Sequence, residues 1–455
     1  MSESTAQLDH RHLWHPFTQQ QGWCEEEPVV IEGAEGTDLI DSDGRRYIDG
    51  TSSLWCNVHG HRNPRVDRAV RAQLARVAHS TMLGLTHPAA ADLAAELAAI
   101  APPGLTRVFY SDSGSTATEI ALKMAFQYWQ QRGGQHRRRT AFVSLRDGYH
   151  GDTIGAVSVG GIDLFHGAYG PLLFRSRRVE PGDAAELERV LELHQEEIAA
   201  VIVEPLVQGA AGIRVQPPGY LRRVRELCDC HDAFLICDEV ATGFGRTGTM
   251  FACEQERVAP DFLCLGKGLT GGYLPLAATL TTERVYEGFL GAHEDYRTFF
   301  HGHTFTGNPL ACAAALASLE VFREEGTLLR LQPKIRLLGE LLEPIAAMPE
   351  VAEVRGRGFM VGIDLGEHEP ALRLGHRVTL AARERGVIVR PLGDVIVLMP
   401  PLAISKADLR RLVEVVGESI RAAYEGAYGG SRREGTVEPL PAPAPAAQGE
   451  ARHAA

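Results

Sequence analysis

The chain has 455 residues, enough for about two or three domains, and its 44% hydrophobic and 23% charged residues are typical of a soluble globular protein. A formal net charge of −12 argues against a nucleic-acid partner, because binding to phosphates requires clustered cations. The N-terminus lacks the basic and apolar regions of a secretory signal, and no apolar run is long enough to span a bilayer, so we expect no membrane association. The eight cysteines are scattered without a C-x-x-C pair, which fits free thiols in a reducing cytoplasm.

Helical and strand patterns alternate from residue 61 to residue 326. Asn63 and Pro64 are typical of an N-cap and a first helical turn, and apolar residues follow them at helical spacing. Helical segments separate most of the short aliphatic runs further along, which predicts a domain built around a mostly parallel α/β sheet. The runs expected to form its central strands are 107–110, 141–145, 200–203, 234–237, 262–265 and 276–280.

The pattern changes after residue 326. Shorter elements predict a smaller α/β unit over residues 327–426, and we expect residues 1–60 to join it. Proline, alanine and glycine dominate residues 427–455, which we expect to be disordered. The elements expected in the smaller unit are an amphipathic helix at 328–348, strands at 358–365 and 387–390, and a closing helix at 407–424.

Lys267 carries the most informative chemical signal. It follows the aliphatic run 262–265 and is flanked by Gly266 and Gly268, so the chain turns tightly at the end of a buried strand. Partial desolvation at such a place lowers the pKa of a lysine amine and frees its lone pair, as a Schiff-base lysine requires. A surface lysine in a glycine-rich loop is the alternative interpretation.

Polar residues at the ends of other predicted strands suit an aromatic, phosphorylated ligand. Asp238 ends the run 234–237, where it can pair with a protonated ring nitrogen or cap the next turn. Gly114 and Ser115 open a helix, where free N–H groups and hydroxyls bind phosphate or serve as ordinary caps. Tyr149 follows a glycine near another strand end, where it can stack on a planar ligand or pack in the core.

These residue types together meet the requirements of a phosphorylated pyridine aldehyde, so we predict pyridoxal 5′-phosphate as the cofactor. The histidine pairs at 59 and 61 and at 301 and 303 lack nearby carboxylate or cysteine partners, so no metal site is expected. No G-x-G-x-x-G motif follows an early strand, which disfavours a nicotinamide-binding Rossmann domain.

Sequence blocks at 111–115, 148–152, 238–248 and 266–272 resemble the class III aminotransferases of the fold-type I pyridoxal phosphate enzymes. The resemblance extends over roughly residues 12–425. It implies an α/β fold with a large domain on a mostly parallel seven-stranded sheet, a smaller α/β domain and a homodimer. Further blocks are similar to the branch of the family that aminates 8-amino-7-oxononanoate in biotin biosynthesis, and they lie at 15–18, 52–55, 79–81, 301–305 and 390–393.

The resemblance also implies roles for individual residues. Lys267 would hold the cofactor and move protons, Asp238 would pair the ring nitrogen, and Tyr149 would stack on the ring; these three are the expected catalytic residues. Arg390, with Arg246 nearby, would bind the carboxylate of the keto substrate. Residues 302–304 would come from the partner subunit. The expected cofactor-binding residues are Gly114, Ser115, Tyr149, Glu204, Asp238, Val240, Lys267, His303 and Thr304, and the expected substrate-facing residues are Phe17, Leu54, Trp55, Tyr149, Arg246, Gly302 and Arg390.

Three departures from the family pattern leave the amino donor open. Phe17 and Leu54 stand where members that use S-adenosylmethionine typically carry tyrosine and tryptophan, and His303 replaces a proline. Some relatives with this pattern are associated with lysine, so the donor is S-adenosylmethionine or lysine. A broad ω-amine or diamine aminotransferase and a glutamate semialdehyde aminomutase are the alternative enzymes. A catalytically inactive binding protein is disfavoured by the intact Lys267 and Asp238.

Overall fold

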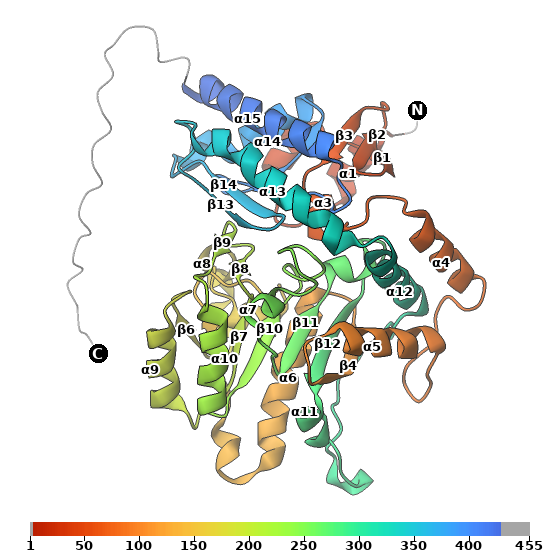
Figure 1. Cartoon of the computed structure of the whole chain (residues 1–455), viewed down its shortest axis with the longest axis vertical. Helices are drawn as coiled ribbons and strands as arrows, with labels where there is room; N and C mark the ends of the chain where they lie inside the picture. Colours follow the sequence, from red (N-terminus) through yellow and green to blue (C-terminus); the bar gives the residue numbers. More distant parts are fainter. Residues whose placement is uncertain (1–2, 429–455) are drawn as a thin grey trace, which may run out of the picture.

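The structure, a computed structural model, describes residues 3–428 (Figure 1). The segment 427–455, which the composition predicts to be disordered, lies outside the described residues from position 429 onward. Figure 1 shows a large sheet with flanking helices in the lower half, and smaller sheets beneath two long C-terminal helices in the upper half. The N-terminal strands lie beside those C-terminal helices in the view.

A seven-stranded sheet forms the larger part of the molecule, with the order β4-β12-β11-β10-β7-β5-β6. Its strands from β11 to β6 are parallel, and only β12 runs antiparallel to both of its neighbours, which confirms the predicted, mostly parallel α/β sheet. β7, β10 and β11 are buried along their whole length, as expected for aliphatic strands covered on both faces. The seven strands are β4 (Leu105–Ser111), β12 (Ala277–Thr282), β11 (Phe262–Leu265), β10 (Phe234–Asp238), β7 (Ile198–Val203), β5 (Ala141–Leu145) and β6 (Ser176–Val179).

Helices cover this sheet. The central one, α6, packs against β7, β11 and β12. The predicted start at Asn63 is confirmed, because its side chain accepts a hydrogen bond from the N–H of Arg65 and Pro64 occupies the first turn. The helices of this part are α4 (Pro64–Leu74), α5 (Pro88–Ile100), α6 (Gly114–Arg132), α7 (Ile154–Val159), α8 (Asp163–His166), α9 (Ala184–His194), α10 (Tyr220–Cys230), α11 (Glu283–Glu287) and α12 (Pro309–Glu324). Short 3₁₀ helices are η1 (Gly134–Arg138), η2 (Gly167–Leu172), η3 (Ala252–Glu256), η4 (Lys267–Thr270), η5 (His293–Asp295) and η6 (Pro370–Leu372).

The two ends of the described chain meet in a four-stranded sheet. Strand β15 from the C-terminal region pairs in parallel with β3 from the N-terminal region, so residues far apart in sequence form one structural unit. This sheet contains β1 (Ile31–Glu35), β2 (Asp38–Asp41), β3 (Arg46–Asp49) and β15 (Val387–Ile388). A second four-stranded sheet contains β13 (Glu353–Arg357), β14 (Met360–Asp364), β17 (Val395–Leu398) and β16 (Arg390–Leu392), and a separate hairpin consists of β8 (Val207–Gln208) and β9 (Arg214–Val215). The remaining helices are α1 (Thr5–His12), α2 (Gln20–Glu25), α3 (Ser52–Trp55), α13 (Thr327–Ala346), α14 (Leu374–Glu384) and α15 (Lys406–Tyr428).

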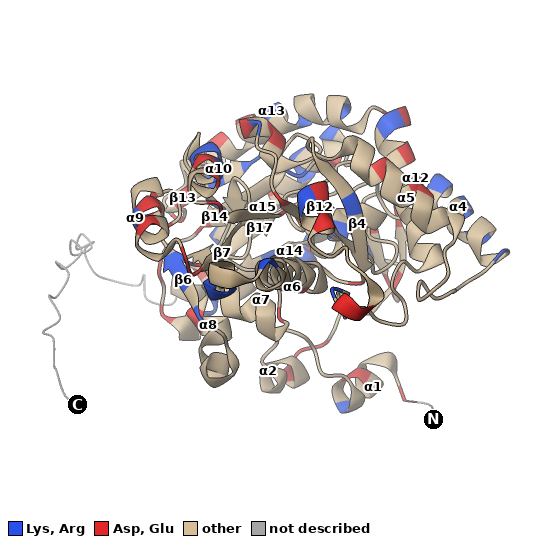
Figure 2. Cartoon of the chain, turned by 90° about the horizontal axis from the view of Figure 1, so that it is seen from below, with Lys and Arg blue, Asp and Glu red and all other residues tan. Residues whose placement is uncertain are grey.

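The surface carries charges of both signs. Figure 2 shows acidic and basic residues interspersed along the outer helices on the side that it presents. Within residues 3–428, no helix is both long and apolar enough to cross a membrane.

Candidate active site

A cavity of about 310 Å³ lies beyond the carboxyl ends of the strands of the large sheet, where parallel α/β sheets bind their ligands. The loops after β4, β5, β7, β10 and β11 each contribute residues to it, and the N-terminal and C-terminal segments close it from the other side. Its volume is within the usual range of small-molecule sites. Eleven of the predicted site residues line it: Phe17, Leu54, Trp55, Gly114, Ser115, Tyr149, Glu204, Asp238, Val240, Lys267 and Arg390.

Lys267 lies one residue past the glycine that ends β11, as the sequence predicted. Its φ of 43° is in the left-handed region, which is uncommon for a residue with a side chain. Desolvation lowers the pKa of its amine, although the nearby carboxylates of Asp238 and Glu204 act in the opposite direction. The amine lies 4.6 Å from the centre of the Trp55 ring. A buried amine with a lowered pKa is the state in which lysine acts as a nucleophile or a base.

Asp238 ends β10 with its carboxylate buried at the cavity. One oxygen accepts a hydrogen bond from the N–H of Val240 at 3.1 Å, and the other lies 2.8 Å from Nδ1 of His150. The opposite ring nitrogen of His150 is buried without a partner among the described residues. The two hydrogen bonds fix the orientation of the Asp238 carboxylate at the cavity, which suits a carboxylate that must face a cationic group.

A candidate phosphate site, called here the phosphate cradle, lies where β4 leads into α6. The helix begins at Gly114, and its free N–H groups and positive dipole end face the cavity. A Cβ atom on Gly114 would lie 2.4 Å from Cγ1 of Val240, so a side chain at this position would displace its neighbour. The Ser115 hydroxyl accepts from the N–H of Thr153 at 2.9 Å and donates to that residue's hydroxyl, also at 2.9 Å. Because Gly114 has no side chain, the backbone N–H groups at the start of α6 stay accessible to a ligand. Such groups bind anions.

Tyr149 and Glu204 are joined by a hydrogen bond on the opposite wall of the site. The N–H of Tyr149 donates to Glu204 at 3.0 Å, and the Tyr149 hydroxyl donates to Asp152 at 2.7 Å. A second N–H, from Gly209, donates to the other oxygen of Glu204 at 2.8 Å. Burial raises the pKa of Glu204 to about 7, and it also raises the pKa of the Tyr149 phenol.

Arg390 supplies a cation to an apolar and aromatic part of the cavity. Its guanidinium lies 6.0 Å from the centre of the Phe17 ring, and desolvation lowers its pKa. Phe17 also packs edge-on against Phe165 of α8, with ring centres 5.5 Å apart. Among the described residues, no carboxylate forms an ion pair with Arg390. Its five donors are therefore available to a negatively charged ligand.

Leu54 and Trp55 reach the cavity from a left-handed helical turn. The four residues of α3, Ser52–Trp55, all have positive φ values, between 43° and 73°. The N–H of Trp55 donates to the carbonyl of Thr51 at 2.6 Å and that of Cys56 to Ser52 at 3.2 Å, so the turn has helical hydrogen bonds of the opposite hand. This conformation costs about 1–2 kcal/mol for each residue other than glycine. Surrounding contacts must therefore stabilise it.

The structure does not bring the other four predicted site residues to this cavity. Arg246 is almost fully buried beneath α3, where its guanidinium donates to the carbonyls of Pro400 and Asn57 and to the Ser52 hydroxyl instead of facing a substrate. Gly302, His303 and Thr304 lie in the loop before α12 and do not line the cavity of their own chain.

Several cavity residues were not predicted from the sequence. His150, Gly151 and Asp152 belong to the block 148–152, so their motif was recognised but they were not singled out. Leu392 likewise belongs to the recognised block 390–393. Phe165, in α8, had no distinguishing signal and reaches the site only through the fold. The other unpredicted lining residues are Ser113, Ala210 and Ala241.

The residues present fit pyridoxal phosphate. The cavity combines a lysine amine of lowered pKa, a buried carboxylate and a helix start whose glycine leaves no room for a side chain. These groups match the aldehyde, the ring nitrogen and the phosphate of the cofactor, respectively. Within residues 3–428, no group of three or more histidine, cysteine or acidic side chains is arranged to hold a metal ion.

The lysine, the carboxylate and the phosphate cradle on a mostly parallel seven-stranded sheet define a pyridoxal phosphate-dependent enzyme of fold type I. The family description "Aminotransferase class-III" matches residues 21–420, and the chain belongs to this family. This membership confirms the predicted family, cofactor and enzyme class.

Individual relatives agree with this assignment. The chain is 58% identical, over 93% of its length and 83% of the relative's, to the adenosylmethionine-8-amino-7-oxononanoate aminotransferase of Nitratidesulfovibrio vulgaris. Against the protein of the same name from Geobacter sulfurreducens, the identity is 51% over 93% and 99% of the two chains. The crystal structure of the Methanocaldococcus jannaschii protein of that name has a TM-score of 0.89 and 44% identity, covering 91% of this chain and 98% of the other. A pyridoxal phosphate-bound amine transaminase from an uncultivated Pseudomonas species has a TM-score of 0.85 and 37% identity, covering 90% and 99%.

Proposed function

We propose that this aminotransferase transfers an amino group to 8-amino-7-oxononanoate and forms 7,8-diaminononanoate, a reaction of biotin biosynthesis. Relatives at 58% and 51% identity carry the name of this activity. The single observation that supports the substrate most directly is Arg390, a cavity cation that forms no ion pair among the described residues and lies beside Phe17. A keto acid with a carboxylate at the end of an aliphatic chain complements a guanidinium in aromatic surroundings.

Each residue of the cavity has a separate role in the proposed reaction. When bound, pyridoxal phosphate supplies an electrophilic carbon and a ring that withdraws electrons. Lys267 would hold the cofactor through its Nζ atom, and the same amine would take up and return the proton at the reacting carbon of the substrate. Asp238, oriented by His150, would face the ring nitrogen, while the first N–H groups of α6, including that of Ser115, would bind the phosphate. Tyr149 would stack on the ring, and Glu204 fixes the backbone of Tyr149 by accepting a hydrogen bond from its N–H.

Val240 supports the cofactor site by filling the space beside Gly114, and Leu54, Trp55 and Phe17 exclude water from the substrate. The name of the relatives favours S-adenosylmethionine as the donor, while the departures at Phe17 and Leu54 favour lysine as the second candidate.

The proposal includes a homodimer in the cytoplasm. Gly302 and Thr304 are exposed, and His303 is half-buried, in a loop that is absent from the cavity of its own chain. We assign this loop to the active site of the partner subunit, where His303 and Thr304 contact the cofactor and Gly302 the substrate. The free cysteines within the described residues fit a reducing compartment. We also assign residues 61–326 to a cofactor-binding domain, and residues 1–60 with residues 327–426 to a second domain.

The proposed reaction is tested with purified protein, pyridoxal phosphate and 8-amino-7-oxononanoate, with S-adenosylmethionine and lysine offered in separate reactions. We expect 7,8-diaminononanoate to form with one of the two donors. Turnover of simple amines with pyruvate, but no product from 8-amino-7-oxononanoate with either donor, would reject this substrate.

That outcome would support a second candidate, a broad amine transaminase. The structural similarity to the Pseudomonas amine transaminase favours this candidate, because the two chains align over nearly their full lengths. The cofactor residues do not separate the two functions, since both reactions need them. The two functions are separated by measuring how the replacement of Arg390 changes the KM for 8-amino-7-oxononanoate.

A further inference from the structure

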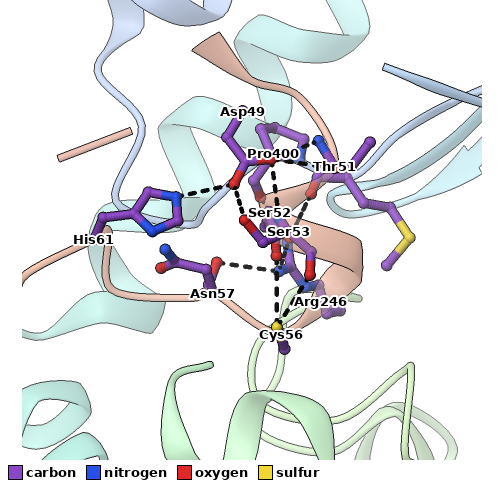
Figure 3. Close-up of polar contacts among 10 residues, drawn as sticks. Asp49, Thr51, Ser52, Ser53, Cys56, Asn57, His61, Arg246 and Pro400 are labelled. Atoms are coloured by element: carbon purple, nitrogen blue, oxygen red, sulfur yellow. Dashed lines mark hydrogen bonds and ion pairs between the residues drawn. The ribbon is translucent and has the colours of Figure 1, made fainter. Parts of the chain in front are cut away.

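The left-handed turn α3 is held in place by a buried carboxylate. Asp49, the last residue of β3, is completely buried and lies three positions before Ser52, the first residue of the turn. Its Oδ1 atom accepts hydrogen bonds from the Ser53 N–H at 2.9 Å and the Thr51 hydroxyl at 3.1 Å, and its Oδ2 atom accepts from the Ser53 hydroxyl at 2.8 Å. The Nε2 atom of His61 lies 3.0 Å from Oδ2. In Figure 3, the His61 ring and the Ser53 side chain point toward the Asp49 carboxylate.

Within the turn, Ser53 donates to Asp49 through both its backbone N–H and its hydroxyl. Burial alone raises the pKa of the Asp49 carboxyl, but the hydrogen bonds from His61 and Ser53 outweigh this effect, and the net shift of the pKa is downward. The ionised carboxylate thus matches the donors around it. Since Asp49 accepts from both the backbone and the hydroxyl of Ser53, it directly stabilises a residue whose φ is 43° and whose ψ is 51°.

Arg246 holds the same turn through Ser52. Its guanidinium donates to the Ser52 hydroxyl at 2.6 Å, and this hydroxyl donates to the carbonyl of Met399 at 2.7 Å (Figure 3). The turn is therefore fixed to the C-terminal part of the chain as well as to β3. Its position relative to Lys267 is set by these contacts, because Trp55, the last residue of α3, carries the ring that faces the lysine amine.

We propose that Asp49 is a positioning residue of the active site: it holds α3 in its left-handed conformation and so sets where Leu54 and Trp55 stand against the amino donor at Lys267. This inference rests on the proposed aminotransferase reaction for its kinetic part. Leu54 and Trp55 both line the cavity, and they follow each other on a turn whose backbone direction cannot be kept by local propensity. The carboxylate at position 49 thereby acts on substrate fit without contacting the substrate.

Relief of the backbone strain provides the first test. Asp49→Ala should lower the Tm of the holoenzyme, and adding Ser53→Gly should recover at least half of that loss, because glycine adopts positive φ values at no steric cost. Asp49→Asn keeps one carbonyl acceptor and should give an intermediate Tm, so the test remains informative if the alanine variant does not fold. Failure of Ser53→Gly to recover stability in the Asp49→Ala or the Asp49→Asn protein would overturn the proposal.

Donor kinetics provide the second test. The donor half-reaction is followed by absorbance in single turnovers of the holoenzyme, without the acceptor. We expect the donor concentration for half-maximal rate to rise roughly tenfold in Asp49→Asn, since small displacements of positioning groups change rates up to about a hundredfold. Ser53→Gly should not reverse this rise, because it relieves strain without restoring the position of Trp55.

Asp41 is the matched control. It is a buried aspartate of the adjacent strand β2 that accepts from the Tyr47 hydroxyl at 2.7 Å and the Arg45 N–H at 2.8 Å, away from the cavity. Asp41→Asn should lower the Tm and leave donor kinetics unchanged. Unchanged donor kinetics in Asp49→Asn, or an equal change in Asp41→Asn, would overturn the positioning role. Absence of activity toward 8-amino-7-oxononanoate would reject only the proposed acceptor, because neither test uses it.

Discussion

Replacing Arg390 with methionine separates acceptor binding from every other property of the site. Methionine keeps an apolar stem against Phe17 and removes only the charge and the hydrogen-bond donors. Because no carboxylate pairs with Arg390 within residues 3–428, its removal leaves no unpaired charge in the protein. A hydrogen bond to a charged group contributes about 1.5–3 kcal/mol, so the KM for 8-amino-7-oxononanoate should rise by roughly ten- to a hundredfold.

The assay measures initial rates with the acceptor varied at saturating donor, and then with the donor varied at saturating acceptor. The donor KM and the Tm of the protein should stay close to those of the unchanged enzyme. Arg390→Lys should recover only part of the loss, because an ammonium cannot form two parallel bonds to a carboxylate. Arg383→Met is the control, since Arg383 is a half-buried arginine of α14 whose pKa is also lowered by desolvation but which lies outside the cavity. An equal loss for donor and acceptor would refute carboxylate recognition by Arg390.

Three further predictions concern the cofactor site. Lys267→Ala should abolish turnover, and borohydride reduction with peptide mapping should find the label of the unchanged enzyme on Lys267 and no other lysine. Gly114→Ala should weaken cofactor binding in a fluorescence titration by about 1–3 kcal/mol, because its Cβ would clash with Val240. Adding Val240→Ala should restore much of the affinity. A loss of affinity that Val240→Ala leaves unchanged would contradict the clash as the cause. Glu204→Gln should reduce the fall in urea stability between about pH 4.5 and pH 7, because burial raises the pKa of Glu204 to about 7. The folded protein then binds the Glu204 proton more tightly than the unfolded chain does, so the free energy of unfolding falls by roughly 3 kcal/mol as the pH rises through this range. Burial also raises the pKa of Glu239 to about 7, so Glu239 would account for the fall that remains in the Glu204→Gln protein.

The large sheet and the places of Lys267 and Asp238 at its strand ends could be predicted because their signals are local. Aliphatic runs mark the buried strands, and Lys267 and Asp238 follow two of them directly. β6 was missed, because its sequence Ser-Arg-Arg-Val is polar and lies at the edge of the sheet, where a strand needs no continuous apolar run.

The left-handed turn could not be predicted, because no glycine marks Ser52–Trp55 and distant residues stabilise its conformation. The dependence on distant contacts also explains why the sequence did not show that Arg246 lies outside the cavity. Its residue type suits a substrate carboxylate, but only the fold shows that its donors are taken by carbonyl groups of Asn57 and Pro400. Phe165 is the converse case, a residue of the short helix α8 without a sequence signal that the fold brings to Phe17. Contacts between distant segments, rather than residue type, decide these positions.

The pairing of β3 with β15 determines the order in which the two halves of the site can form during synthesis. Ser52 donates to the carbonyl of Met399, 347 positions later, so the turn that carries Leu54 and Trp55 is completed only when almost the whole described chain has been made. The strands that carry Lys267 and Asp238 are all made before that point. Because chains fold from the N-terminus as they emerge, the nascent protein contains the cofactor half of its site well before the substrate half. Strand β3 must meanwhile remain without its partner strand β15.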